Sequence, residues 1–376
     1  MNQTICCLNP RCEQPLNPTG NKFCNSCGQG LIEYLRNRYQ PLTLLSDEGG
    51  FGRTYLASDR DSLDSLCVIK QLIPQGAAGN TASTAQFTKV KELFQREAQQ
   101  LKELGEHAQI PALLGFFAEQ HHPNPNKLFY LIQQFIDGQP LDKISPGIAW
   151  SEDEVKKFLL NILPVLQFIH EKGVIHRDLK PQNIIRRASD QKYVLIDFGA
   201  SKEMVGSAKT GTKIYTLGYA PYEQMIELKT YPATDLYSLG VTCFHLLTNQ
   251  DPGPLCALSG AKWVEQWQQQ ISPGIKISGG LRTVLDRLLQ WEHGQRYQSA
   301  DQVMADLAMI EIPQGTVASS PTKKKNPPPK VRASQPANPK SQRQPSTPVK
   351  KTFFKCQTAQ LVEEWKKIGF WALAMK

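Results

Sequence analysis

The chain has 376 residues, which is long enough for one large domain with appendages, and its hydrophobic content of 40% is ordinary for a globular protein. Its net charge of +9 is unevenly distributed: residues 312–376 hold 13 Lys and Arg against two Glu, and the other 311 residues hold 30 Lys and Arg against 32 Asp and Glu. The basic character therefore belongs to the tail, and we expect no specific nucleic-acid surface on the folded part.

The sequence also lacks the signals that would direct the chain into or across a membrane. No apolar run approaches the ~18–20 residues that a membrane-spanning helix requires. The chain starts Met-Asn-Gln-Thr-Ile-Cys, without the charged and apolar regions of a secretory signal. We therefore expect a cytoplasmic protein.

The first 30 residues form a cysteine-rich prefix. Four residues separate Cys7 from Cys12, two separate Cys24 from Cys27, and a short spacer joins the pairs. This spacing is typical of four thiolates around Zn²⁺ in a zinc-ribbon-like segment. A metal would also supply the stability that so short a segment cannot gain from hydrophobic burial. A redox-active thiol set or an iron–sulfur site is the alternative interpretation.

The other five cysteines need separate consideration. Cys6 adjoins the first pair and could replace Cys7 as a ligand, a choice that the spacing leaves open. The remaining four stand apart from one another and are expected to be packing residues: Cys67, Cys243, Cys256 and Cys356.

A larger domain is predicted from about residue 39 to residue 312. Near its start lies the glycine-rich run Gly49-Gly50-Phe51-Gly52. Glycine has no Cβ, so backbone N–H groups in such a run can approach phosphate oxygens closely. Taken alone, the run is also compatible with an ordinary hairpin turn.

The next elements alternate between short apolar runs and one helical pattern. A short apolar run ends in Lys70, helical periodicity follows near residues 87–104 and includes Glu97, and residues 129–132 form another strand-like run. Further along, helical periodicity is dominant, as in residues 152–170 and 281–290. The order predicts a β-rich first part and a larger helical second part.

The most informative run is His-Arg-Asp-Leu-Lys-Pro-Gln-Asn at residues 176–183, followed by an Asp-Phe-Gly motif that begins at Asp197. Asp178 would accept the proton of an attacking alcohol, and Lys180 would stabilise charge on a transferred phosphoryl group. Asn183 and Asp197 offer the hard oxygen ligands that Mg²⁺ or Mn²⁺ takes. The grouping is suited to holding a metal–triphosphate and handling a hydroxyl proton.

Three further motifs follow in the chain: Gly-Tyr-Ala-Pro-Tyr-Glu at 218–223, Asp-Leu-Tyr-Ser-Leu-Gly at 235–240 and Gln-Arg-Tyr at 295–297. In this order, the motifs of residues 39–311 resemble those of eukaryotic-type (Hanks-type) Ser/Thr protein kinases. The resemblance implies an α+β, bilobal fold with a small β-rich N-lobe and a larger helical C-lobe, preceded here by the small cysteine-rich metal-binding segment. It also implies transfer of the γ-phosphoryl group of ATP to protein Ser or Thr.

The same resemblance implies residue roles around the nucleotide. Gly49 to Gly52 would cover the ATP phosphates, Lys70 would hold them with Glu97 as its partner, and the backbones of Gln134 and Ile136 would bind the adenine edge. Among the later motifs, it implies that Thr216 contacts Asp178 and Lys180, Asp235 anchors the catalytic loop, and Arg296 pairs with Glu223. The prefix and the run Gly-Gly-Phe-Gly-Arg-Thr-Tyr-Leu-Ala are similar to those of a group of cyanobacterial Ser/Thr kinases.

Regulation by phosphorylation is a further expectation. Arg177 precedes Asp178 and could pair with a phosphorylated threonine of the activation segment. Thr210 and Thr212 are the candidates, and we expect autophosphorylation. The alternative is that both are ordinary loop residues.

One departure from the family pattern concerns ATP affinity. Asp47 occupies the position of the first glycine of the phosphate loop, where its charge would weaken ATP binding unless it points to solvent. No departure removes a residue that handles protons, metal or phosphate, so an active enzyme is the main interpretation. The alternative is a catalytically impaired scaffold or adaptor that binds nucleotide or partners.

The C-terminal part has a different composition. Residues 313–350 contain Pro-Pro-Pro and scattered Lys, Ser and Gln, which predict a disordered or polyproline linker. Residues 351–376 form a basic amphipathic segment, a candidate for contact with an anionic membrane surface or an acidic partner. A solvated linker with a weakly packed end is the alternative, and the oligomeric state is left open.

Overall fold

The computed structural model describes residues 4–49, 52–72, 84–120, 127–144, 146–198, 216–271 and 274–310. The chain divides into two compact units, Met1–Ile310 and Glu311–Lys376. The predicted linker and basic C-terminal segment lie outside the described residues. The cysteine prefix and the larger predicted domain both belong to the first unit.

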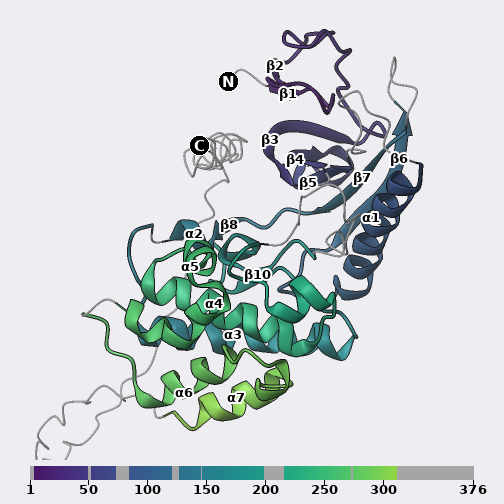
Figure 1. Ribbon diagram of the computed structural model, residues 1–376. Coiled ribbons are helices and arrows are strands. Elements are labelled where there is room, and N and C mark those ends of the chain that lie inside the picture. Colours follow the sequence, from purple (N-terminus) through teal and green to yellow (C-terminus); the bar gives the residue numbers. More distant parts are fainter. Residues whose placement is uncertain are drawn as a thin grey trace, which may run out of the picture. The chain divides into compact units, whose positions relative to one another are not determined.

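The N-lobe is built on a five-stranded antiparallel sheet with strand order β3-β4-β5-β7-β6 (Figure 1). Its strands are β3 (Tyr39–Gly49), β4 (Gly52–Asp59), β5 (Ser65–Leu72), β6 (Leu113–Gln120) and β7 (Lys127–Gln134). One long helix, α1 (Thr84–Leu104), contacts β6, and the rings of Phe94 and Phe116 lie 5.7 Å apart there. Successive side chains of a strand point to opposite faces, so Lys70 and Gln71 lie on different faces of the sheet.

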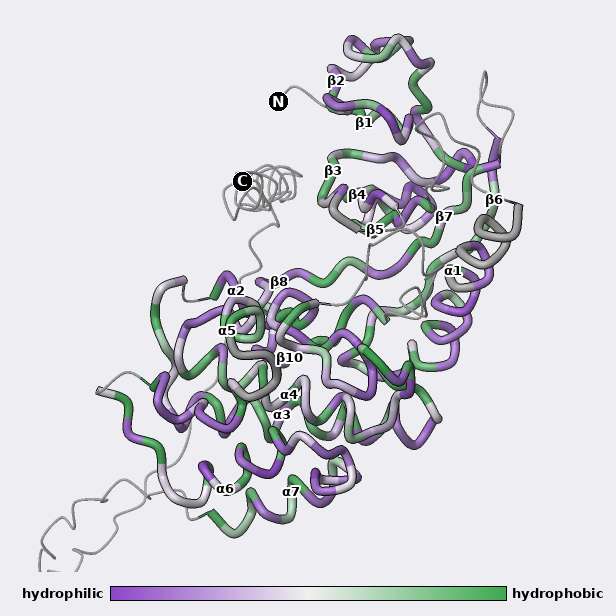
Figure 2. The backbone as a smooth tube through the Cα atoms, in the orientation of Figure 1, coloured by the Kyte–Doolittle hydropathy of each residue, from purple (hydrophilic) through white to green (hydrophobic). Residues whose placement is uncertain are grey.

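The C-lobe is mainly helical. Its helices are α2 (Leu141–Ile144), α3 (Glu152–Glu171), α4 (Pro232–Thr248), α5 (Pro252–Ser259), α6 (Gly279–Leu288) and α7 (Ala300–Ala308). A small antiparallel sheet of β8 (Gly138–Pro140), β9 (Ile184–Arg187) and β10 (Tyr193–Leu195) accompanies them. Hydrophobic and hydrophilic stretches alternate along the helices in Figure 2, as expected when one face of each helix is buried.

Helix α3 illustrates how the sequence specifies a C-lobe element. Ser151 caps its first turn by accepting the N–H of Glu154, and the Glu154 carboxylate accepts the N–H of Ser151 in return. The helix then buries an apolar stripe that includes Phe158, Ile162 and Leu166, each 0% exposed. Capping and burial together define this helix.

The C-lobe also contains a buried ion pair between distant parts of the chain. Glu223 lies in a π-helical turn (Glu223–Glu227) and is 2% exposed, and Arg296 is 1% exposed. Arg296 Nη1 lies 2.7 Å from Glu223 Oε1, and Arg296 also donates to the carbonyls of Gln290 and Trp291. The pairing of Arg296 with Glu223 agrees with the expectation from the sequence.

The cysteine prefix adds a two-stranded sheet. Strand β1 (Thr4–Cys6) pairs antiparallel with β2 (Leu16–Pro18) and also contacts β3. Cys6 and Leu8 belong to the same buried apolar cluster as Tyr55 and Ile69 of the N-lobe sheet. The prefix therefore shares a core with the N-lobe.

These features confirm the expected α+β division into a β-rich N-lobe and a helical C-lobe. The helices predicted near residues 87–104, 152–170 and 281–290 correspond to α1, α3 and α6, with ends that differ by a few residues. Within the described part of the chain, no helix combines the length and apolar character needed to cross a bilayer.

Candidate functional site

The predicted catalytic loop, residues 176–183, lies between α3 and β9 and is anchored by a buried aspartate. Asp235 of α4 is 0% exposed, and its carboxylate accepts the N–H groups of His176 and Arg177, each at 2.8 Å. Arg177 has φ of 71°, a costly left-handed conformation that the bond to Asp235 helps to hold. Burial opposes the ionisation of Asp235, but hydrogen bonds, first that from His170, keep its pKa below its usual value.

Three side chains converge on the buried carboxylate of Asp178, which is 4% exposed. Its Oδ1 accepts the hydroxyl of Thr216 at 2.9 Å, and its Oδ2 accepts the Asn183 amide at 2.7 Å. Lys180 Nζ lies 3.2 Å from the same Oδ2 and donates to Thr216 Oγ1 at 2.9 Å. The predicted proton acceptor and the predicted charge-stabilising lysine thus belong to one polar cluster.

His176 joins this cluster to the Asp-Phe-Gly segment. Its Nε2 donates to the carbonyl of Ile196 at 3.0 Å, and its Nδ1 accepts the N–H of Asp178 at 3.3 Å. These roles fit a neutral ring, and burial lowers the pKa of His176. The N–H of Ile196 in turn donates to the carbonyl of Asn183 at 2.9 Å. The two predicted cation ligands, Asn183 and Asp197, therefore lie on adjacent segments.

Lys70 links the N-lobe to this region. Its Nζ lies 2.5 Å from Glu97 Oε1 of α1 and 2.9 Å from Asp197 Oδ1. Burial opposes the charged form of Lys70, but the Asp197 and Glu97 carboxylates raise its pKa above the usual value. The lysine therefore remains a cation, in the ion pair with Glu97 that the sequence predicted.

The donor set of Asn183 and Asp197 fits a hard divalent cation. The Asn183 amide nitrogen donates to the backbone carbonyl and the carboxylate of Asp178, so the amide oxygen is the atom suited to coordination. The side chain of Asp197 is 39% exposed, which leaves it accessible from solvent. One amide and one carboxylate are typical ligands for Mg²⁺, which keeps several waters and coordinates phosphate as well.

The glycine-rich run is partly described. Gly49 and Gly52 are opposite one another at the ends of β3 and β4, whereas Gly50 and Phe51 lie outside the described residues. A Cβ at Gly52 would lie 1.9 Å from the carbonyl oxygen of Gln71, so a larger residue cannot fit without moving the strand. Asp47 is exposed, the arrangement in which solvent screens its charge.

The predicted hinge follows β7. Gln134 donates its N–H to the carbonyl of Ala112 at 2.9 Å, and its side-chain Oε1 accepts the N–H of Ala112 at 3.3 Å. Ile136 is 5% exposed and lies in the segment between β7 and β8. The side chain of Gln134 thus holds the neighbouring loop, and adenine binding by the two backbones stays a prediction.

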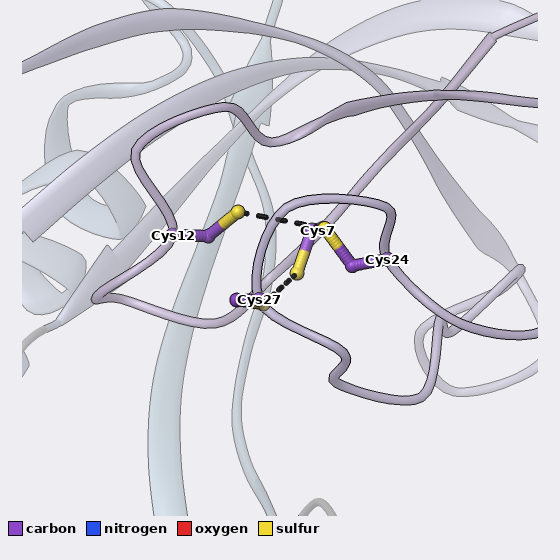
Figure 3. A group of neighbouring side chains, drawn as sticks. All are labelled: Cys7, Cys12, Cys24 and Cys27. Atoms are coloured by element: carbon purple, nitrogen blue, oxygen red, sulfur yellow. Dashed lines mark hydrogen bonds between the residues drawn. The ribbon is translucent and has the colours of Figure 1, made fainter.

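The four prefix cysteines meet in a second cluster (Figure 3). The Sγ atoms of Cys7, Cys12, Cys24 and Cys27 lie within 4.8 Å of one another, with Cys7 and Cys27 at 3.7 Å and Cys12 and Cys24 at 3.5 Å. Tetrahedral ligands at the Zn–S distance of ~2.3 Å would be ~3.8 Å apart. Cys6 is instead packed in the N-lobe core, which leaves Cys7 as the member of the first pair.

The surroundings of the sulfurs affect their ionisation in two opposite ways. Burial raises the pKa of the Cys7 and Cys12 thiols. Burial acts the same way on Cys24, but backbone N–H groups of the following turn and the Asn17 amide lower its pKa to about 6. Asn17 Nδ2 lies 3.5 Å from the Cys24 sulfur. The grouping of the four sulfurs could hold a metal ion, and a bound divalent cation would favour the thiolate forms against the effect of burial.

The cysteines outside the prefix have different surroundings. Cys67 and Cys243 are 0% exposed inside apolar clusters, and Cys256 is half-buried against the C-lobe core. These three are packing residues, as predicted, whereas Cys356 lies outside the described residues.

The predicted phosphorylation sites, Thr210 and Thr212, lie outside the described residues. Two residues that the sequence did not single out, Arg53 and Gln71, contact the cysteine prefix from the N-lobe sheet. Arg53 belongs to the run Gly-Gly-Phe-Gly-Arg-Thr-Tyr-Leu-Ala and Gln71 follows Lys70, but neither position indicates a contact with the prefix.

Comparison with known proteins gives a consistent assignment. The family model described as protein kinase domain matches residues 47–307. Serine/threonine-protein kinase B of Synechocystis sp. is 40% identical over 315 residues, which cover 81% of this chain and 51% of that protein. Serine/threonine-protein kinase F of Synechocystis sp. is 40% identical over 319 residues, covering 78% of this chain and 62% of that protein. The chain thus spans about half to three fifths of the length of these curated relatives.

A solved structure is similar in fold. The PknI kinase domain of Mycobacterium tuberculosis superposes with a TM-score of 0.51 and 19% sequence identity, covering 74% of this chain and 99% of that one. At this identity the likeness concerns the fold alone.

Proposed function

Because the chain belongs to the protein kinase domain family, we propose that it is a Ser/Thr protein kinase that transfers the γ-phosphoryl group of Mg-ATP to protein hydroxyls. The proposal is carried by one observation: Lys180, Thr216 and Asn183 all contact the carboxylate of Asp178. The curated relatives are named serine/threonine-protein kinases, which supports Ser and Thr as acceptors.

The residues of this cluster would act chiefly by positioning and electrostatics. Asp178 would orient the attacking hydroxyl and accept its proton, while its Oδ1 keeps the hydrogen bond from Thr216. Lys180, 3.2 Å from Asp178, would stabilise negative charge near the attacking oxygen. Thr216 would fix the positions of Lys180 and Asp178 relative to each other, because its hydroxyl accepts a hydrogen bond from Lys180 and donates one to Asp178.

The nucleotide would be held by residues of both lobes. Lys70, kept charged beside Glu97 and Asp197, would pair with phosphate oxygens, and Gly49 and Gly52 would let backbone N–H groups approach them. The backbones of Gln134 and Ile136 would bind the adenine edge. Mg²⁺ bound by Asn183 and Asp197 would neutralise charge on the phosphates.

The proposal can be tested by incubating the purified full chain with Mg-ATP and a peptide mixture containing Ser, Thr and Tyr. We expect phosphate on Ser and Thr, identified by fragment mass spectrometry. Phosphate on Tyr alone, or none on any peptide despite tight nucleotide binding, would contradict the proposal. The second of these results is the one that the scaffold alternative predicts.

Phosphorylation of the activation segment is part of the proposal. Replacing both Thr210 and Thr212 by Ala should slow activation, because Arg177 would lose a phosphate partner. The measurement is the lag in peptide phosphorylation after Mg-ATP is added to dephosphorylated protein. Replacement of Thr283, which is exposed on α6, by Ala is the control. Equal lags in the double-Ala variant and the unmodified chain would exclude Thr210 and Thr212 as activating sites.

We also propose that the four prefix cysteines bind Zn²⁺. Support comes from the mutual approach of the four sulfurs within 4.8 Å and from the Asn17 amide beside Cys24. Metal analysis of protein purified without added metal should find stoichiometric zinc. Iron with the optical spectrum of an iron–sulfur cluster, or no metal, would contradict this assignment.

Two proposals rest on the sequence alone. A cytoplasmic location would place the protein where ATP and protein substrates are available. The basic segment at residues 351–376 would contact an anionic membrane surface or an acidic partner. Membrane contact would be tested by comparing how much protein sediments with anionic vesicles and with neutral vesicles.

A further inference from the structure

The cysteine prefix covers one face of the N-lobe sheet. We call this face the outer face and define it by Tyr55, Ile69 and Tyr130, which are each 0% exposed. It lies opposite the face that carries Lys70, because neighbouring residues of a strand alternate. Leu8 of the prefix belongs to the buried cluster formed by these outer-face residues. The outer face is therefore kept from water with the help of the prefix.

Two hydrogen bonds connect the prefix to this face at its polar end. The side chain of Gln71 donates through Nε2 to the carbonyl of Leu8 at 2.8 Å. Arg53 donates through Nη1 to the carbonyl of Asn9 at 3.0 Å. Both acceptors lie in residues 8–11, the loop between the first two cysteines of the cluster.

The two donors are buried and form part of one network. Gln71 is 1% exposed and Arg53 is 8% exposed, and they face each other as partners in the β4–β5 ladder. The Gln71 side chain also contacts the hydroxyls of Tyr55 and Tyr130, each at 3.1 Å. A buried donor that loses its acceptor carries a desolvation cost, so these residues would shift if the loop moved away.

A shift of these residues would reach the phosphate-binding elements directly. Gln71 follows Lys70 in β5, and Arg53 follows Gly52 in β4. The position of a Cβ on Gly52 would be only 1.9 Å from the Gln71 carbonyl oxygen, so the glycine lies against the Gln71 backbone. The backbone of Gln71 therefore contacts Gly52 of the glycine-rich run and is covalently joined to Lys70.

We propose that Arg53 and Gln71 are positioning residues for ATP, and that a metal at the four-cysteine cluster holds the loop on which they depend. The inference rests on the proposed function, since it assumes that Lys70 and Gly52 bind ATP phosphates. The metal closes the loop at Cys7 and Cys12, and the loop carbonyls fix the β4–β5 ladder through the two side chains. Loss of the metal therefore weakens ATP binding without removing any residue that touches ATP.

The first test removes metal ligands one at a time. In the full chain, Cys12→Ser and Cys24→Ser should lower the metal content and weaken the affinity for a fluorescent ATP analogue, measured with Mg²⁺ present, by about tenfold. Cys256→Ser, a half-buried cysteine outside the cluster, is the matched control and should change neither quantity. Loss of metal with unchanged nucleotide affinity would overturn the proposal.

The second test acts on the sheet side. Arg53→Met removes the donor to Asn9, whereas Arg53→Lys retains one. We expect Arg53→Met to raise KM for ATP about tenfold with kcat changed less than about twofold, and Arg53→Lys to restore most of the affinity. Equal KM values for Arg53→Met and the unmodified chain would overturn the positioning role.

Hydrogen exchange distinguishes local loosening from general unfolding. In Cys12→Ser and Arg53→Met, exchange should increase in β4 and β5 and stay unchanged in α4 and α6. Increased exchange in all of these elements together would mean a loss of global stability and would overturn the proposal. Failure of the unmodified chain to bind ATP would refute the proposed function, whereas ATP binding that is indifferent to these changes refutes this inference alone.

Discussion

Replacement of Asp178 by Asn is expected to lower the rate of phosphoryl transfer by about 10³-fold, or roughly 4 kcal/mol in activation free energy. The amide keeps the size of the carboxylate and can still accept the Asn183 amide through its remaining oxygen, so the fold and nucleotide affinity should be retained. It cannot accept the proton of the attacking hydroxyl, and it provides no negative charge for Lys180. The measurement is the single-turnover rate at saturating Mg-ATP.

A matched control separates this effect from a general response to the loss of a carboxylate. Asp64 is exposed and has φ of 58°, a conformation that Asn adopts as readily as Asp. Asp64→Asn should therefore transfer phosphate at the rate of the unmodified chain. Similar rates for Asp178→Asn and Asp64→Asn would remove Asp178 from the mechanism.

Replacement of Arg296 by Met is expected to lower the free energy of unfolding by about 3–5 kcal/mol. The guanidinium contacts Glu223 and the carbonyls of Gln290, Trp291 and Ala233, and the change would leave a buried carboxylate without its cation. The measurement is denaturant unfolding followed by C-lobe tryptophan fluorescence.

An exposed ion pair in the same lobe supplies the comparison for that change. Arg287 is 46% exposed and lies 3.5 Å from Asp306, so Arg287→Met should cost less than about 1 kcal/mol. If Arg296→Met were no more destabilising than Arg287→Met, the buried pair would not be a stabilising feature of the C-lobe.

The elements that the sequence predicted best are those whose residues are close together in the chain. Residues 176–183 place Asp178, Lys180 and Asn183 within one loop, and their contacts follow largely from that spacing. Helix α3 was equally predictable, because its apolar stripe and the cap at Ser151 are local signals. Motif order then indicated which distant segments would meet.

The docking of the cysteine prefix could not be predicted in the same way. Its hydrogen bonds join Leu8 to Gln71 and Asn9 to Arg53, partners that are 63 and 44 residues apart in the chain. Both acceptors are backbone carbonyls, so the residue types at positions 8 and 9 do not indicate these bonds. The choice of Cys7 over Cys6 also required the structure. It follows from the contact of β1 with β3, which brings Cys6 into the N-lobe core.

The exposure of Asp47 is a third feature that required the structure. The sequence places a negative charge beside the predicted phosphate-binding run, and only the path of β3 determines which way the side chain lies. Exposure is the arrangement in which screening by solvent would limit the repulsion between Asp47 and ATP.

The proposed activity is the transfer of phosphate to Ser or Thr through Asp178. The most direct measurement is the intact mass of purified, dephosphorylated protein before and after incubation with Mg-ATP, with the modified residues then mapped by peptide fragmentation. We expect added phosphoryl groups on Ser or Thr in the unmodified chain and none, over the same incubation time, in Asp178→Asn. An unchanged mass in the unmodified chain together with no transfer to any added protein, or equal phosphorylation in Asp178→Asn, would contradict it.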